Sequence, residues 1–220
     1  MVRLINRLVN DCFSKAQLFI KFSMVTFMIL GSLLANLAQA VEMTKEEYQL
    51  LPTYCRNQGN VAPNYFKPEH EAGWRDRLGK DFQHIHHYCW GLVSLARTYK
   101  AGRTAAERKH RLTTAIQDFN FSIDRATPEF VLLPEIYTKV GQAYLGLQDD
   151  QNAEIAFKKA WEANPEYWPA YLWWAQRLMK QGRQREALAV AEEGLKNSPS
   201  SKPLERLIAE MRGSGKGARK

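Results

Sequence analysis

The chain has 220 residues, of which 45% are hydrophobic and 25% are charged, and its formal net charge is +8. This length suffices for one domain with an export signal and excludes two ordinary domains. Residues 41–220 contain 27 basic and 22 acidic residues. This excess of positive charge is mild, and the sequence has no basic helix with interleaved aromatic residues. We therefore do not expect a nucleic-acid partner.

The first forty residues have the pattern of a secretory signal peptide. A basic segment precedes an apolar run from Phe22 to Leu37, which ends at the small-residue site Ala38-Gln39-Ala40. Cleavage after Ala40 would leave residues 41–220 periplasmic or secreted. The alternative is an uncleaved inner-membrane anchor formed by residues 22–38, because the apolar run approaches the length of a bilayer span. We expect membrane contact only through this segment.

Residues 41–80 predict a loop-rich leader. Thr44 is followed three residues later by Glu47, which is the arrangement of a capped helix start. Residues 57–70 contain several Asn, Gly and Pro residues and predict a loop. A short helix is expected from Trp74 to Leu78.

Residues 81–133 predict a degenerate helical hairpin. Apolar residues recur at helical spacing from about Asp81 to Ala101, and again from about Thr104 to Ala126. Gly102 separates these two helices. The segment 128–133 is an addition before the next helix.

A cluster of histidines lies at the start of this hairpin. His84, His86 and His87 are close to Cys89, and imidazoles with a thiolate one turn away can chelate zinc or copper. In an exported protein, however, two cysteines most simply form a disulfide. A Cys55–Cys89 disulfide would close about 34 residues and stabilise the fold by roughly 3 to 4 kcal/mol. We expect this disulfide, with a metal site at the three histidines or free thiols as the alternatives.

No catalytic motif accompanies the cluster. The sequence contains no serine elbow, phosphate-binding loop, haem-attachment pattern or carboxylate pair in a recognisable context. We therefore expect neither an enzyme nor a cofactor.

Two later stretches superimpose at an offset of 34 residues, and the coinciding positions are those that two packed helices need for their contact. These positions are Tyr137, Val140, Gly141, Tyr144, Ala153, Phe157, Ala160 and Pro165 in the first stretch, and Tyr171, Trp174, Ala175, Leu178, Ala187, Ala191, Gly194 and Pro199 in the second. Small residues let the helices approach, and the prolines end each unit.

This spacing resembles the tetratricopeptide repeat. The resemblance implies an all-α, right-handed α-α solenoid of helical hairpins. Residues 134–212 would form two units and a C-terminal capping helix from Lys202 to Met211. Residues 213–220, which carry much of the excess positive charge, would form a disordered basic tail.

The resemblance extends more weakly toward the amino terminus. In residues 81–133, Ala96 and Tyr99 correspond to the opening pair of a repeat, and Ala115, Phe119 and Ser122 to the closing positions. The leader, with its motifs around Cys55 and Cys89, resembles small secreted repeat proteins of proteobacteria, which fits a bridge between the two cysteines.

The family resemblance also implies a partner-binding groove along the first helix of each unit. Transferred to this chain, with a nearby tryptophan added, its residues are Glu135, Thr138, Gln142, Leu145, Leu172, Trp173, Gln176, Met179 and Lys180. Their mixed polar and apolar character suits an extended peptide or a partner's helix. The lysines and asparagines with which chaperone-binding members hold a terminal carboxylate do not occur at the corresponding positions, so that ligand is not implied.

From these features we expect a periplasmic adaptor without chemistry of its own. It would bind a protein or peptide partner in envelope assembly, secretion or polysaccharide export. The alternative is a metal- or cofactor-handling protein that uses the cluster from His84 to Cys89.

Overall fold

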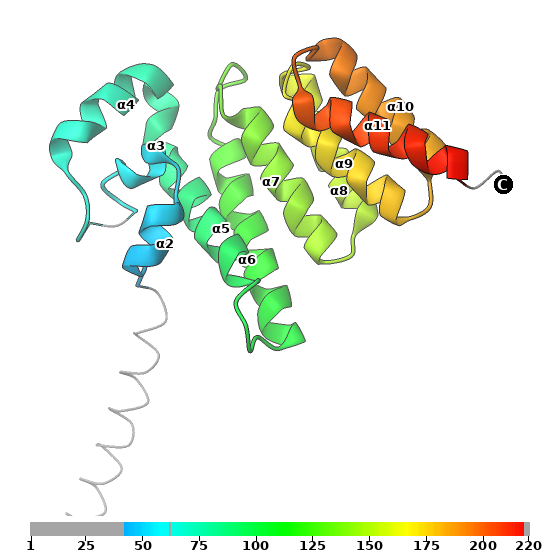
Figure 1. Cartoon of the computed structure of the whole chain (residues 1–220). Helices are drawn as coiled ribbons and strands as arrows, with labels where there is room; N and C mark the ends of the chain where they lie inside the picture. Colours follow the sequence, from blue (N-terminus) through cyan, green and yellow to red (C-terminus); the bar gives the residue numbers. More distant parts are fainter. Residues whose placement is uncertain (1–41, 62, 218–220) are drawn as a thin grey trace, which may run out of the picture. The chain divides into compact units, whose positions relative to one another are not determined.

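The computed structural model describes residues 42–61 and 63–217 (Figure 1). The segment 1–40, for which the sequence predicts a signal peptide or an anchor, lies outside the described residues, and so do the last three residues of the predicted tail. Within the described ranges, no helix is long and apolar enough to cross a membrane. The residues from Lys45 onward form one unit.

The leader contains more helix than the sequence predicts. Its elements are α2 (Lys45–Leu50), α3 (Thr53–Arg56), the 3-10 helix η1 (Pro68–His70), α4 (Glu71–Leu78) and the 3-10 helix η2 (Gly79–His84). Cys55 of α3 forms a disulfide with Cys89, with an S–S distance of 2.00 Å. The predicted disulfide is therefore present, and it attaches the leader to the first long helix.

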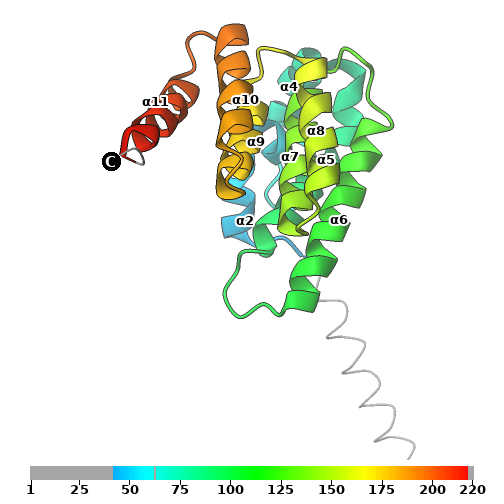
Figure 2. The same cartoon turned by 90° about the vertical axis from the view of Figure 1, so that its right-hand side faces the viewer.

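The longer helices pack in neighbouring pairs (Figures 1 and 2). They are α5 (Ile85–Arg97), α6 (Ala105–Ile123), α7 (Leu133–Gly146), α8 (Asp150–Ala163), α9 (Trp168–Lys180), α10 (Gln184–Asn197) and α11 (Lys202–Gly217). Helix α5 packs on α6, α7 on α8 and α9 on α10, while α11 contacts both α9 and α10. The residues that the structure describes contain no β-strand. The all-α prediction is confirmed, and the right-handed solenoid of the tetratricopeptide type stays a prediction.

Contacts between glycines and aromatic rings hold two of the hairpins together. A Cβ atom on Gly141 of α7 would lie 2.7 Å from the ring of Phe157 of α8, and one on Gly91 of α5 would lie 2.4 Å from the ring of Phe119 of α6. Because Cβ atoms do not approach rings this closely, only glycine lets the two helices pack at either position. In the third hairpin, the buried Ala175 of α9 and Ala191 of α10 occupy the positions of the glycine and the ring.

The first hairpin therefore aligns with the later ones through Gly91, and not through Ala96 as the sequence predicts. Ala96 is exposed, and 75% of Tyr99 is exposed. Gly91 is 28 positions from the ring that it contacts, whereas the equivalent separation in α7–α8 is 16. The additional residues lie mainly in α6 and in the loop that precedes it. The end of this hairpin therefore projects past the α7–α8 end (Figures 1 and 2).

Asp81 explains why the first long helix begins later than predicted. The sequence predicts a helix from Asp81, but residues up to His84 form η2, and α5 starts at Ile85. The buried carboxylate of Asp81 accepts hydrogen bonds from the N–H of Thr127 at 2.9 Å and from its hydroxyl at 2.6 Å. These bonds hold the turn against the segment between α6 and α7.

Helix α11 continues to Gly217, whereas the sequence predicts that a disordered tail begins at Gly213. Leu204, Leu207 and Ile208 are buried on its inner side, as expected for a helix that covers the end of the stack. Once packing has fixed the first turns, each added residue gains a backbone hydrogen bond, which lets the helix propagate into a glycine-containing segment.

Candidate partner-binding face

The first helices of the three hairpins, α5, α7 and α9, contact one another in that order. Two depressions lie along this face. One is between the leader, α5 and α7, and the other is between α7 and α9, with Tyr99 on the rim of both.

The leader-side depression has a volume of about 330 Å³ and a mainly apolar wall. Its lining residues are Glu47, Leu50, Leu51, Pro52, Leu92, Val93, Leu95, Ala96, Tyr99, Glu135 and Lys139. Because Leu50, Leu51 and Pro52 come from the leader, this chain itself fills part of the predicted groove. The groove that remains open is shorter than the repeat pattern implies.

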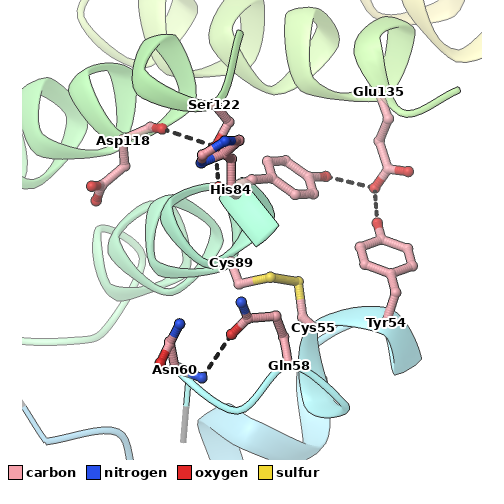
Figure 3. The surroundings of a disulfide bond; sticks show 10 residues. Tyr54, Cys55, Gln58, Asn60, His84, Cys89, Asp118, Ser122 and Glu135 are labelled. Atoms are coloured by element: carbon pink, nitrogen blue, oxygen red, sulfur yellow. Dashed lines mark hydrogen bonds between the residues drawn. A yellow bond between two sulfur atoms is a disulfide. The ribbon is translucent and has the colours of Figure 1, made fainter. Parts of the chain in front are cut away.

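Glu135 is committed to bonds inside the molecule. Its Oε1 accepts a hydrogen bond from the hydroxyl of Tyr54 at 2.8 Å and another from the hydroxyl of Tyr88 at 2.6 Å. Figure 3 shows Tyr54 directed at Glu135, close to the disulfide. Burial, with the charge of Glu135 as a further cause, raises the pKa of Tyr54 and of Tyr88 above the ordinary tyrosine value. Both hydroxyls therefore keep their protons and donate to the carboxylate.

Lys139 lies between the two depressions. Its half-buried side chain lines the leader-side depression, and its Nζ is 3.4 Å from Oε1 of Gln142, which lines the other. Burial lowers the pKa of Lys139, while the negative charge of Glu135 opposes this shift.

The depression between α7 and α9 has a volume of about 200 Å³. It brings together five predicted groove residues, Gln142, Leu145, Trp173, Gln176 and Lys180. Gly146, at a further groove position of the family, also lines it, together with Tyr99 and Arg177. Trp173 is 41% exposed, an unusual value for so large a ring. Arg177 donates two hydrogen bonds, of 2.6 and 2.8 Å, to the carboxylate of Asp150, which orients the guanidinium along the rim.

Three predicted groove residues do not line either depression. Thr138 is only 2% exposed, and its hydroxyl donates to the carbonyl of Pro134 at 2.8 Å, so it cannot contact a partner. Leu172 and Met179 are partly buried against the core of the last hairpins. The sequence pattern missed Tyr99, Lys139 and Arg177, because the first was assigned to the core and the other two lie outside the family's groove positions.

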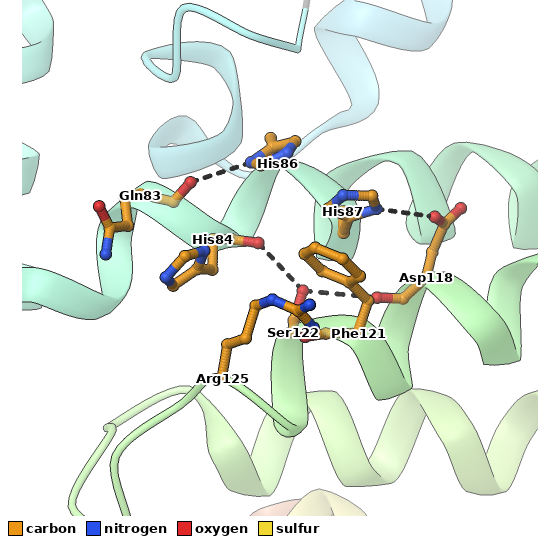
Figure 4. Close-up of polar contacts among 8 residues, drawn as sticks. All are labelled: Gln83, His84, His86, His87, Asp118, Phe121, Ser122 and Arg125. Carbon is orange, nitrogen blue, oxygen red and sulfur yellow. Dashed lines mark hydrogen bonds and ion pairs between the residues drawn. The ribbon is translucent and has the colours of Figure 1, made fainter.

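The histidines at the start of α5 are engaged with different neighbours (Figure 4). Nδ1 of His86 is 2.9 Å from the carbonyl oxygen of Gln83, and Nδ1 of His87 is 3.1 Å from the carboxylate of Asp118. The backbone carbonyl of His84 accepts a bond from Ser122. Burial lowers the pKa of His86.

These contacts do not support the predicted alternative of a metal site at His84, His86 and His87. The described part of the chain contains no group of three or more His, Cys, Asp or Glu side chains that could hold a metal ion. Cys89 is in the disulfide and cannot supply a thiolate ligand.

Comparison with known proteins gives no assignment. No protein-family model matches the chain, and no curated protein matches it significantly.

Proposed function

We propose that this chain is an exported adaptor of the tetratricopeptide type, which binds an extended segment of a partner polypeptide in the depression between α7 and α9. The observation that carries the proposal is the exposed ring of Trp173 at a depression that also contains two regularly spaced amides. Large aromatic side chains that remain partly exposed at a concave site are frequent anchors of binding energy.

The two amides belong to equivalent positions of successive hairpins. Gln142 of α7 and Gln176 of α9 are 34 residues apart, which is the repeat length. Packed helices are about 8–10 Å apart, and an extended chain covers this distance in about three residues. The two side chains therefore suit backbone groups of one extended segment, whose apolar side chains would contact Trp173 and Leu145.

Export is the second part of the proposal. The buried Cys55–Cys89 disulfide is consistent with a compartment outside the cytoplasm, because reducing conditions disfavour such bonds. Together with the signal pattern of residues 1–40, it supports a role in the cell envelope, such as assembly, secretion or polysaccharide export.

Photo-crosslinking tests the binding face directly. A benzophenone amino acid placed at Trp173 should crosslink one partner in envelope extract, and the same probe at Ile155, which is 47% exposed on α8, should not. The crosslink should disappear in the double variant Gln142→Ala/Gln176→Ala. The control is Gln151→Ala/Gln184→Ala, which removes two exposed amides from α8 and α10. Equal crosslinking from both probe positions, or equal yield in both double variants, would remove this assignment.

A further inference from the structure

Positive charge is concentrated at the end of the α5–α6 hairpin, which we call the basic tip (residues 97–111). Its basic residues are Arg97, Lys100, Arg103, Arg108, Lys109 and Arg111, and its acidic residue is Glu107. The other described residues contain 19 basic and 21 acidic residues. The net positive charge of the described chain is therefore contributed by this short segment alone.

The basic tip is also the part of the hairpin that projects. The residues by which α5–α6 exceeds α7–α8 lie between Gly91 and Phe119, and the tip is the middle of this segment. In both views the hairpin end extends past the α7–α8 end (Figures 1 and 2). Residues 99–102 and 104–110 are exposed.

Two acids pair with only three of these six cations. Glu47 pairs with Arg97 and Lys100, and Glu107 pairs with Arg103 at 3.4 Å. None of the ion pairs within residues 42–213 involves Arg108, Lys109 or Arg111.

The three remaining cations have different surroundings. Arg108 and Lys109 line a depression next to the α7–α8 loop. Asp149 also lines it, but its carboxylate accepts bonds from the N–H and the amide of Asn152. Arg111 does not line this depression. Burial lowers its pKa, the positive charges of Arg103 and Arg97 lower it further, and the negative charges of Glu107 and Glu47 oppose the shift.

We propose that the basic tip contacts the headgroups of anionic phospholipids. Because the six cations are distributed along the hairpin end, with only Arg108 and Lys109 sharing a depression, they suit an extended anionic surface better than a single small anion. Each Lys or Arg near such a surface increases the partition coefficient of a protein onto the membrane by about fivefold. The contact is independent of the polypeptide-binding face, since Arg108, Lys109 and Arg111 line neither of its depressions.

Vesicle co-sedimentation tests the contact, with the protein as it is isolated from cells. Vesicles of phosphatidylcholine are compared with vesicles of equal parts phosphatidylcholine and phosphatidylglycerol, and the ratio of the two partition coefficients cancels any binding through the amino-terminal segment. The tip variant is Arg108→Gln/Lys109→Gln/Arg111→Gln. The control, Arg185→Gln/Lys196→Gln/Arg206→Gln, removes the same charge from exposed positions on α10 and α11. A third variant, Arg108→Lys/Arg111→Lys, keeps the charge.

We expect a clear preference of the wild type for the anionic vesicles. In the tip variant, the ratio of the partition coefficients for anionic and neutral vesicles should fall by on the order of 100-fold, because three positive charges are removed. The control should retain most of it, because charges farther than a Debye length from the surface are screened. The lysine variant should bind like the wild type. The proposal is overturned by equal losses in both triple variants, by absence of preference for anionic vesicles, or by tip-dependent binding to soluble heparin without vesicle binding.

Discussion

The hydroxyl of Tyr54 donates a hydrogen bond of 2.8 Å to Oε1 of Glu135, although 81 positions separate the two residues. This bond joins the leader to α7, the first helix of the second hairpin. The disulfide joins the same part of the leader to α5. The leader is thus bound to two successive hairpins and forms a wall of the candidate partner-binding face.

Tyr54→Phe should destabilise the protein by about 2 kcal/mol, because a hydrogen bond to a charged carboxylate is lost while Glu135 stays half-buried. Urea unfolding would measure the change. Tyr99→Phe is the matched control, since 75% of Tyr99 is exposed. A similar midpoint for the two variants would contradict a stabilising role of the bond.

Removal of the disulfide by Cys55→Ser/Cys89→Ser should lower the free energy of unfolding by about 3–4 kcal/mol. The bond closes a sequence separation of 34 residues and restricts the unfolded chain. Thermal unfolding with and without reductant gives the readout. Reductant should lower the midpoint of the wild type and leave the double variant unchanged. A wild type that is insensitive to reductant would argue against this contribution.

Gly141→Ala should destabilise the protein by about 1–3 kcal/mol, because the added methyl group would lie 2.7 Å from the ring of Phe157. Gly73→Ala provides the control in another helix, where a Cβ meets no atom within 4 Å. This second change should be neutral or stabilise by up to about 1 kcal/mol, since alanine favours helix. If both substitutions shift the unfolding midpoint in the same direction, the tight α7–α8 contact does not explain the effect.

Acid should weaken the link between α8 and α9. Hydrogen bonds from Arg177 hold the pKa of Asp150 below its ordinary value of 3.8. A carboxylate whose pKa is lower in the folded state stabilises the fold fully above its ordinary pKa, and this contribution is lost as the pH falls through the lowered value. The difference in unfolding free energy between wild type and Asp150→Asn should therefore shrink below pH 3.8. The control is Glu166→Gln, which removes an exposed carboxylate that forms no ion pair within the described chain.

Trp173→Ala should weaken binding of the crosslinked partner by about 30-fold, which corresponds to about 2 kcal/mol. Ile155→Ala, which removes an exposed apolar side chain from α8, should change the affinity by less than twofold. Both variants should keep the unfolding midpoint of the wild type. Isothermal titration calorimetry provides the affinities, and equal effects of the two changes would contradict a specific anchor at Trp173.

Local patterns were sufficient to predict most of the helices. The helix predicted from about Thr104 is α6, whose first turn is closed by a capping box of Thr104 and Glu107. The periodic apolar residues mark the helices of the two clear repeats. The cysteine pairing followed from compartment chemistry and resemblance, because only two cysteines remain after residues 1–40.

Long-range contacts could not be predicted in the same way. Tyr54 bonds to Glu135 and Asp81 accepts from Thr127, and no local sequence pattern predicts hydrogen bonds between such distant segments. The alignment of the first hairpin was wrong because helix length changed between repeats, so that Gly91 took the place assigned to Ala96. The charge of the basic tip was visible in the sequence, but its projection beyond the neighbouring hairpin was not.

Different elements cover the two ends of the stack of hairpins. The leader, fixed by the Cys55–Cys89 disulfide, packs at the α5 end, and α11 packs on α9 and α10 at the other (Figure 1). Stacked hairpins with bare ends can join copies end to end into filaments. In the described part of the chain, the buried Leu204, Leu207 and Ile208 of α11 take the place that a further hairpin would occupy next to α9 and α10.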